Sequence, residues 1–425
     1  MNYKSITLKC MSFLLGAFAC ERMHAQDTTH ITIKAAEKQF LDKNLQLLAE
    51  KYNIDIARAD VIQARLYNNP NFSVSTALYN QDQKKFLDVS NSTGQYGFGL
   101  SQLIILAGKR NKQIKLAEIN TQQAENNFFD LLRTLRFSLR GDFYNVYFLQ
   151  NSINAYTAQI NTLENLNNAY SDLQAKGVVT LKDAVRIKSL LYSLKAEQTG
   201  LKNQLNDAEA ELQLLLQNNK TFFYAEADSS SPAAAAIDQY NLQGLTDSAY
   251  ANRYDLRLAN NAVMYNQQNY ALQKSLRVPD LTLGAEFDKR GSYINNASFL
   301  NAAIDLPFFN RNQGNIKAAK ISIDQSKTQL ELQRQTVEND VQKAYVKLLT
   351  TNKMLQSFDP GFRSQFQRLM DGVTDNFLKR NISLIDFTDF VESYKNNVLQ
   401  LNQLQNDRMQ AIEALNFSIG KPIIE

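Results

Sequence analysis

Cysteine is almost absent from this chain of 425 residues. Its two cysteines, Cys10 and Cys20, both lie within the first 25 residues. Without that segment the chain has no thiol, which excludes a disulfide framework and a thiolate metal site. Histidine is equally scarce, and both His24 and His30 lie near the N-terminus. This excludes a histidine-based catalytic or metal site deeper in the chain.

Proline and glycine are also few, with six prolines and fifteen glycines in the whole sequence. Because these residues interrupt helices and strands, their scarcity predicts long unbroken elements. Charged residues make up 21% of the chain, and its formal net charge is +4. No basic run stands out, so the composition does not indicate a nucleic-acid partner.

Residues 1–25 have the composition of an export signal. Two lysines precede a short apolar core, Met11–Ala19, and Ala25 supplies the small residue of a cleavage site. The apolar core is too short to span a bilayer as a helix. Lipid attachment at Cys20 is the alternative, and either route exports the chain. Cleavage after Ala25 lowers the net charge from +4 to +2.

The rest of the chain contains a duplication. One pair of short alternating segments begins after Pro70 and another after Pro279, and the turns Thr180–Asp183 and Ser383–Asp386 repeat at the same interval of about two hundred residues. Two strands and two very long helices, duplicated, predict a tube. We therefore expect a signal peptide at 1–25, a first structural repeat at 26–217, a linker or equatorial belt at 218–238, and a second repeat at 239–425.

The alternating segments have the period of β-strands. The first pair flanks a polar loop from Asn80 to Gly94, and the second begins at Leu281. Their apolar positions are Phe72, Val74, Leu78, Tyr96, Phe98, Leu100, Leu281, Leu283, Ala285, Phe287, Leu300, Ala302, Ile304 and Leu306. The edge of a soluble sandwich would show the same alternation. The export signal and the lack of other strand patterns favour strands that cross a bilayer, for which about ten residues suffice.

Helical periodicity fills most of the remaining sequence. We expect one helix over Ile33–Leu66 and one over Lys109–Lys176, which contains no proline and would be roughly 100 Å long. Heptad seams run from Ile187 to Leu215 and from Phe387 to Leu415, and they predict helices packed side by side. A plain two-helix coiled coil would show the same seams. Pro360 predicts a kink or break in the outgoing helix of the second repeat.

Both helical turns contain capping residues. Gly177 can adopt the left-handed conformation that ends a helix, and Thr180 can cap the next helix with Asp183 bonding back. In the second repeat Asn381, Ser383 and Asp386 can do the same. The functional alternative for these carboxylates is an acidic ring around a molecular axis. Asp386 and Asp389 lie one turn apart, so several copies would stack two rings.

Taken together, these residues resemble the TolC-type outer-membrane efflux channels over essentially the whole mature chain. The resemblance rests on the duplicated order of elements, on Leu100-Ser101-Gln102 with Gly108-Lys109-Arg110, and on Lys176-Gly177-Val178-Val179-Thr180. The stretch from Leu306 to Gly314 is similar to the heavy-metal branch, the CzcC and CusC type. Where the family often has glycine, the second turn has Lys379-Arg380-Asn381-Ile382, which departs from the family's pattern.

The resemblance implies a fold and partners. It implies a homotrimer in which each chain gives four strands to one transmembrane β-barrel, continued by a coiled-coil tunnel of α-helices in the periplasm. It implies docking on a periplasmic adaptor protein and an inner-membrane pump of the RND type. It places a gate at Asp183, Asp386 and Asp389. The expected adaptor contacts are the exposed turn residues Gly177, Val178, Val179, Thr180, Arg380, Asn381, Ile382 and Ser383.

Physical chemistry supports oligomerisation independently. Four strands cannot close a barrel, and an open strand edge in lipid leaves backbone groups unpaired. Lipid would contact Leu283, Phe287, Leu300 and Leu306, and a wet lumen would contact Ser73, Gly97, Gly99, Glu286, Asn301 and Asp305.

The function expected is passive export through the outer membrane, gated at the periplasmic helical tip. No nucleotide loop, paired catalytic constellation, cofactor motif or metal-ligand pattern indicates an enzyme. The alternative is an exported coiled-coil spacer or adhesin whose hairpins cap rods. Within the channel hypothesis the cargo stays open among metal ions, drugs and proteins.

Overall fold

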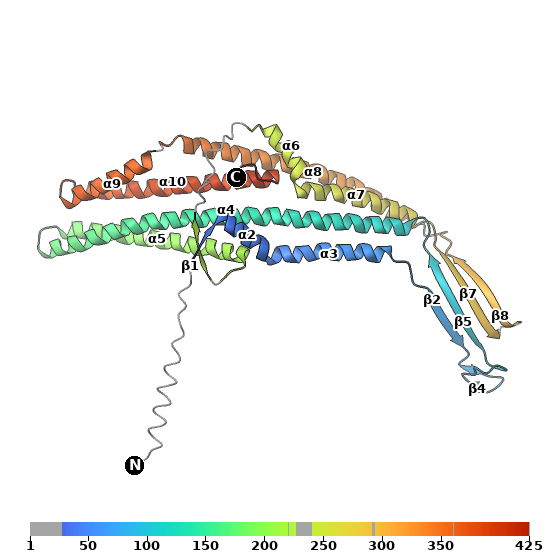
Figure 1. Cartoon of the computed structure of the whole chain (residues 1–425). Coiled ribbons are helices and arrows are strands. Elements are labelled where there is room, and N and C mark those ends of the chain that lie inside the picture. The colour runs from blue at the N-terminus through green and yellow to red at the C-terminus, as the bar shows by residue number, and fades with distance from the viewer. Residues whose placement is uncertain (1–27, 220, 227–239, 291–293, 360, 425) are drawn as a thin grey trace, which may run out of the picture. The chain divides into compact units, whose positions relative to one another are not determined.

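The computed structural model describes residues 28–219, 221–226, 240–290, 294–359 and 361–424. The expected signal peptide and Cys20 lie outside these residues. Figure 1 labels the helices and strands in chain order. The chain divides into two compact units. The turn unit comprises the described residues of Met1–Asn44, Arg136–Ala235 and Leu348–Glu413, and the sheet unit comprises those of Leu45–Leu135, Ala236–Lys347 and Ala414–Glu425.

The turn unit is mostly helical. It contains β1 (Thr28–Thr32), α2 (Ile33–Lys43), most of α4 (Lys109–Ala175), α5 (Leu181–Leu216), β6 (Phe222–Glu226), the end of α8 (Gln313–Gln356), α9 (Phe362–Leu378) and most of α10 (Leu384–Ile419). Helix α4 has 67 residues, which confirms the predicted long helix. The predicted break near Pro360 is confirmed by the gap between α8 and α9, because proline cannot donate to the helical ladder.

The helix expected over Ile33–Leu66 is instead two helices. Helix α2 ends at Lys43 and α3 (Leu45–Arg65) begins two residues later, with Asn44 in an extended conformation between them. The Asn44 side chain is buried and donates from Nδ2 to the Leu215 carbonyl at 3.1 Å. A contact with a residue distant in the sequence therefore determines this break. The spacing of apolar residues contains no information about such a contact, so it could not predict the break.

A pair of strands was missing from the sequence prediction. Strands β1 and β6 pair in parallel, with Thr28 opposite Phe222 and Thr32 opposite Glu226. The Gln150 side chain of α4 donates to the Phe223 carbonyl at 2.8 Å and accepts from the Ala225 amide at 3.1 Å, so it covers one edge of β6. The expectation that 218–238 is irregular is wrong for β6, and residues 227–238 lie outside the described residues. The expectation that the hairpins have no other strands beside them is wrong for both β1 and β6.

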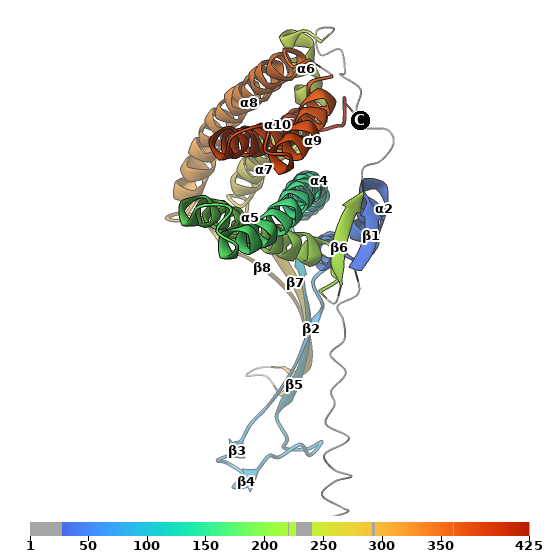
Figure 2. The same ribbon diagram turned by 90° about the vertical axis from the view of Figure 1, so that its left-hand side faces the viewer.

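The sheet unit contains both predicted hairpins in one sheet. Strands β2 (Asn71–Thr76), β5 (Tyr96–Ile104), β7 (Leu281–Arg290) and β8 (Asn295–Ile304) are antiparallel in the order β2-β5-β7-β8 (Figure 2). The polar loop of the first hairpin carries the short strands β3 (Tyr79–Asn80) and β4 (Lys85–Phe86). Helices α3, α6 (Leu242–Asn252) and α7 (Tyr254–Ser275) and parts of α4, α8 and α10 complete the unit.

One strand boundary differs from the prediction. The return strand of the second hairpin was expected to include Leu306, but β8 ends at Ile304. The next residue after Leu306 is Pro307, which has no backbone donor, and the Phe308 amide bonds the Leu306 carbonyl in a turn at 2.9 Å. Leu306 therefore lies outside the strand.

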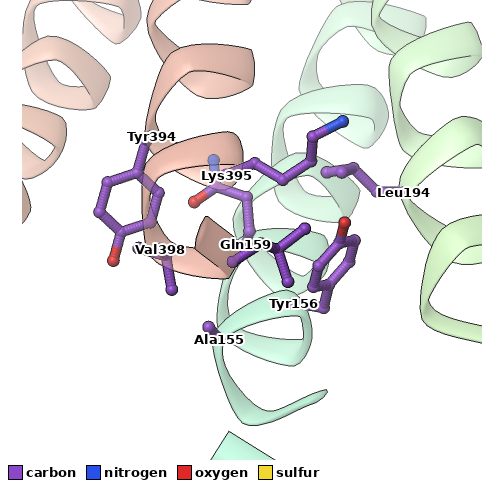
Figure 3. Close-up of a pocket in the computed structure, with 8 residues that line it drawn as sticks. Ala155, Tyr156, Gln159, Leu194, Tyr394, Lys395 and Val398 are labelled. Atoms are coloured by element: carbon purple, nitrogen blue, oxygen red, sulfur yellow. The ribbon is translucent and has the colours of Figure 1, made fainter. Parts of the chain in front are cut away.

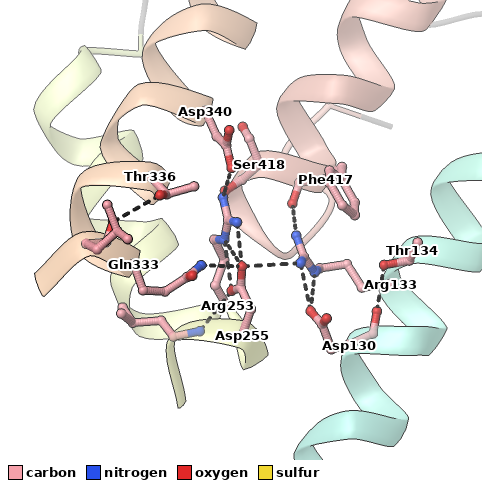
Figure 4. A network of polar contacts seen from close by, with 12 residues as sticks. Asp130, Arg133, Thr134, Arg253, Asp255, Gln333, Thr336, Asp340, Phe417 and Ser418 are labelled. Carbon is pink, nitrogen blue, oxygen red and sulfur yellow. Dashed lines mark hydrogen bonds and ion pairs between the residues drawn. The ribbon is translucent and has the colours of Figure 1, made fainter. Parts of the chain in front are cut away.

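A buried arginine holds the sheet unit together at the α6–α7 junction (Figure 4). The Arg253 guanidinium donates to Asp255 at 2.5 Å, Asp340 at 2.9 Å and the Ser418 carbonyl at 3.2 Å. Arg133 of α4 donates to the Phe417 carbonyl at 2.8 Å. These contacts join the end of α10 to α4, α7 and α8, because each carbonyl and carboxylate accepts from an ionised donor.

No helix within the described residues is both long and apolar enough to cross a membrane.

Candidate functional site

The first helical turn has the predicted caps. After α4 the chain passes through Gly177 at φ +70°, a conformation that glycine adopts without strain. The Val178 amide closes the helix end on the Leu173 carbonyl at 2.9 Å. The Thr180 Oγ1 accepts from the Asp183 amide at 3.2 Å and donates to Asp183 Oδ2 at 2.7 Å. The capping role of Gly177, Thr180 and Asp183 is confirmed.

The second turn reaches the same geometry with different residues. Arg380 occupies the left-handed position at φ +62°, where the first turn has glycine. Ser383 Oγ accepts from the Asp386 amide at 3.1 Å and donates to Asp386 Oδ2 at 2.7 Å. Asn381, expected to help cap α10, instead donates to Asn376 Oδ1 at 3.1 Å and so holds the end of α9.

An aromatic stack connects the helices beside the two turns within the turn unit. Phe377 of α9 stacks on Phe387 of α10 at 4.2 Å and on Tyr170 of α4 at 5.5 Å between ring centroids. Burial and the Asp183 charge raise the pKa of Tyr170, and the Arg380 charge lowers it, so residues of both turns lie near this ring. Heptad spacing marked Phe387 but not its partners, so the sequence did not predict this stack.

The predicted adaptor-contact residues divide by exposure. Gly177, Val178, Thr180, Arg380, Asn381 and Ser383 are exposed, and Val179 and Ile382 are half-buried. Ile382 packs against the apolar cluster that contains Ile187, Phe377 and Phe387. Asp386 and Asp389 are exposed on the first turns of α10. The turns therefore present carboxylates outward together with exposed apolar side chains, Val178, Leu181 and Ile385, over a buried apolar cluster.

A second contact joins α10 to the α4–α5 pair further from the turns. Glu197 of α5 accepts from Tyr156 Oη at 2.7 Å and pairs with Lys395 Nζ at 3.1 Å. Burial alone would raise the pKa of Glu197, but the hydrogen bonds from Tyr156 and Lys395 outweigh it and lower the pKa. Heptad spacing could not single out Glu197, because its partners belong to two other helices.

A small apolar pocket lies beside this contact (Figure 3). It is lined by Ala155, Tyr156 and Gln159 of α4, Leu194 of α5, and Tyr394, Lys395, Val398 and Leu399 of α10. The Gln159 Nε2 is buried and has no hydrogen-bond partner. The interface between α10 and the α4–α5 pair is thus less completely packed here than near the aromatic stack.

The heptad seam of α10 also differs in its middle from the prediction. Val398 is buried as expected, but the next buried positions are Asn402, Asn406 and Met409 rather than Leu401, Gln405 and Arg408. Asn402 donates to Ser152 at 3.1 Å and Asn406 to Asn145 at 3.3 Å. The buried positions step by four twice in succession, from Val398 to Asn402 and from Asn402 to Asn406, where a heptad would alternate three and four, and this extra residue shifts the seam by one position.

The register of the sheet separates an apolar face from a polar face. Phe287 pairs with Phe98 and with Ser298, Leu283 with Ala302, and Leu300 with Ala285. Because paired residues of antiparallel strands point to the same side, Leu283, Phe287 and Leu300 share one face. Leu283 is 43% exposed and Leu300 is 91% exposed.

The opposite face carries the small and polar residues. Ser73 pairs with Gly99, and Ser75 with Gly97. A Cβ on Gly99 would lie 2.5 Å from Ser73 Oγ, so the glycine makes room for that side chain. On the same face the Asn301 amide donates to Glu286 at 3.2 Å. Within the described residues no group of three or more His, Cys, Asp or Glu side chains is arranged to hold a metal ion.

Comparisons with known proteins give the family. The model of the outer membrane efflux protein family matches residues 37–218 and 245–421. The cobalt-zinc-cadmium resistance protein CzcC of Cupriavidus metallidurans is 22% identical over 369 residues, which cover 84% of this chain and 82% of that protein.

Solved structures share the fold. The CmeC outer membrane channel of Campylobacter jejuni aligns with a TM-score of 0.73 at 14% identity over 91% of this chain and 85% of its own. CusC aligns with a TM-score of 0.73 at 16% identity over 92% of both chains.

The chain belongs to the outer membrane efflux protein family. This confirms the resemblance to TolC-type outer-membrane efflux channels, and the similarity to CzcC and CusC agrees with the predicted likeness to their heavy-metal branch. The protein is the outer-membrane component of a tripartite efflux system and extends from the outer membrane into the periplasm. Members of this family form trimeric channels, and its relatives are channel proteins rather than enzymes. The alternative of a structural spacer or adhesin is therefore set aside.

Proposed function

We propose that three copies of this chain form one passive duct, and that each sheet supplies a third of the barrel wall. The observation that carries the proposal is the sheet order, in which β2 and β8 are edge strands of the described sheet. An edge left open in hydrocarbon would leave backbone N–H and C=O groups without partners. Pairing β2 of one copy with β8 of the next satisfies these groups and closes the barrel.

Helix α3 supports the same assembly. It directly precedes β2, and one of its faces packs in the sheet unit through buried Leu47 and Ile54. Another face is apolar and exposed by 44–65% at Leu45, Leu48, Tyr52, Ile56 and Ile62. We call this face the α3 stripe. An apolar stripe of this length fits a protein partner better than water, and a neighbouring copy at the β2 edge would cover it.

In this duct the apolar face of Leu283, Phe287 and Leu300 contacts lipid, with Leu306 just beyond the strand on the periplasmic side. Asp386 and Asp389, with Asp183, form acidic rings that narrow the periplasmic end. The exposed turn residues dock on a periplasmic adaptor protein. An inner-membrane pump of the RND type supplies the energy, because the channel itself conducts passively.

Conductance tests the gate. The variant Asp386→Asn/Asp389→Asn keeps an acceptor for Ser383 and removes the charges, so single-channel conductance in planar bilayers should rise and cation preference should weaken. The control, Asp371→Asn/Asp375→Asn, removes two exposed carboxylates of α9. The gate assignment fails if the first variant conducts like the control and the unmodified channel.

We further propose that the cargo is a divalent heavy-metal cation. Support comes from the likeness over most of the chain to a protein whose name is that of cobalt, zinc and cadmium resistance. Deleting the gene should lower the tolerance of the cells to these metals, and re-expression should restore it. Unchanged metal tolerance together with increased sensitivity to organic toxicants would reject a metal cargo and leave the channel assignment intact.

A further inference from the structure

The loop between β2 and β5, residues 77–95, buries one carboxylate among half-buried hydroxyls. Asp88 is only 7% exposed. Its carboxylate accepts from Thr93 Oγ1 at 2.6 Å and from the Ser90 amide at 3.0 Å. The hydroxyls of Ser90 and Thr93 are 2.8 Å apart. The interior of this loop is therefore a hydrogen-bonded cluster around one carboxylate.

The same loop presents its apolar side chains outward. Five of them are exposed by 48–66%, namely Leu78, Tyr79, Phe86, Leu87 and Val89. Exposed polar side chains, Gln81, Asp82 and Gln83 among them, share the loop surface with these five. Large apolar side chains are normally buried, and an exposed surface that contains several of them marks a contact with an apolar phase or partner. This surface, which we call the loop patch, therefore requires an explanation.

The loop is held in this arrangement by its backbone. Strands β3 and β4 pair Tyr79 with Phe86, and the Leu87 amide bonds the Leu78 carbonyl at 3.0 Å. Asn80 Nδ2 reaches the Thr93 carbonyl at 3.3 Å. A Cβ on Gly94 would lie 2.5 Å from the Ser90 carbonyl oxygen, so the chain turns back closely on itself between these two residues. The loop patch is thus a fixed surface.

One contact shows toward which face of the sheet the loop leans. Lys289 Nζ donates to Asn91 Oδ1 at 2.8 Å. Lys289 follows Phe287 by two residues in β7, so by strand alternation its side chain points to the apolar face. The rings of Phe72, Phe98 and Tyr96 continue that face toward the loop. The loop therefore lies beside the apolar face and away from the face with Glu286 and Asn301.

We propose that the loop patch is a membrane anchor, which inserts its five apolar side chains into the outer leaflet of the outer membrane. Lys84 and Lys85, exposed beside Phe86, lie at the phosphate groups of the lipids. Aromatic and long basic side chains are the residues that suit this boundary, because each has an apolar body and a polar end. The inference rests on the proposed function, in which the apolar face of the sheet contacts lipid.

The absence of tryptophan from the chain gives a direct test. Phe86→Trp, in the full chain assembled in liposomes, places one fluorophore in the loop patch. Leu300→Trp places one on the apolar face, and Leu181→Trp places one beside the first helical turn, at an exposure of 65% that matches Phe86. Lipids brominated on their acyl chains quench only a fluorophore in contact with them.

We expect quenching of Phe86→Trp to a degree comparable with Leu300→Trp, and none for Leu181→Trp. If Leu300→Trp is quenched and Phe86→Trp is not, the anchor is rejected and the lipid-facing sheet survives. A blue-shifted, unquenched Phe86→Trp then assigns the patch to a neighbouring copy. If neither Phe86→Trp nor Leu300→Trp is quenched, the contact of the apolar sheet face with lipid is rejected, and the proposed function fails with it. Should Phe86→Trp not assemble, Val89→Trp on the other limb, exposed by 66%, makes the same measurement.

Discussion

At the residue scale, a buried carboxylate beside β6 makes the stability of the turn unit depend on pH. Glu209 of α5 is 5% exposed. Burial raises its pKa from 4.5 to about 7, and a hydrogen bond with Gln150 lowers it in part. A raised pKa means that the native state favours the protonated form. The stability that this proton contributes is complete below pH 4.5 and is lost as the pH rises through 7.

We therefore predict that Glu209→Gln stabilises the protein at pH 8 by about 2–3 kcal/mol and changes little at pH 4.5. Thermal unfolding of the helices, followed by circular dichroism at both pH values, measures the difference. Asp207→Asn, two residues away and exposed, is the control and should change stability by less than about 0.5 kcal/mol at either pH. Equal effects of Glu209→Gln at the two pH values would contradict this account.

Residue roles that depend on neighbouring sequence were predictable, and those that depend on distant partners were not. The caps at Thr180 and Ser383 follow from a hydroxyl placed three residues before a carboxylate, so the sequence alone reveals them. Glu197 was not predictable, because its partners Tyr156 and Lys395 are 41 and 198 residues away. The aromatic stack of Tyr170 and Phe377 was missed for the same reason.

At the element scale, we expect an added charge to have opposite consequences for assembly on the two faces of the sheet. Leu283→Arg puts a charge on the apolar face, which should cost about 2–4 kcal/mol if that position lies at mid-depth in hydrocarbon. We expect little oligomer in the outer-membrane fraction when the heat-modifiable band is measured on a gel. The control, Thr282→Arg, adds the same charge on the polar face and should assemble. Normal assembly of Leu283→Arg would reject its contact with lipid.

The long elements were predictable and the short ones were not. Few prolines and glycines interrupt the helices, so the sequence predicted α4 almost to its ends and the break between α8 and α9. Strand β6 was missed because five residues carry little pattern, and its edge is satisfied by the Gln150 side chain of α4. The pairing of β5 with β7, which joins the two hairpins, was not predicted either.

An ion pair and a hydrogen bond hold the β5–β7 pairing in place at one end. Asp280, the residue before β7, accepts from Lys109 Nζ at 2.7 Å and from the Leu106 amide at 2.8 Å. Lys109 is only 4% exposed and is the first residue of α4. The exit of the first hairpin is thereby fixed to the entrance of the second. The sequence around either residue does not predict this contact, because Lys109 and Asp280 lie 171 positions apart.

At the scale of the whole molecule, we expect a charge placed in the α3 stripe to weaken the trimer. Ile56→Glu adds a charge to an apolar position that is 60% exposed in the single chain. In the proposed trimer this residue is covered, so burying an unpaired carboxylate should shift the equilibrium from trimer to monomer. Light scattering of the detergent-solubilised protein measures the mass.

The matched control is Asn53→Glu, an exposed position of α3 outside the stripe. It adds the same charge to the same helix and should leave the trimer intact. A trimer that tolerates Ile56→Glu as well as Asn53→Glu would show that the stripe is not the contact between copies.

The two helical pairs of the turn unit differ in bending stiffness. Helix α4 is continuous for 67 residues, so tilting its end requires breaking backbone hydrogen bonds. Helix α9 is separated from α8, and its ladder begins anew at Phe362. The outgoing arm of the α9–α10 pair can therefore bend at that interruption without breaking a helix, whereas α10 is continuous over Leu384–Ile419. We expect opening to start in this pair while α4 and α5 serve as the stationary frame.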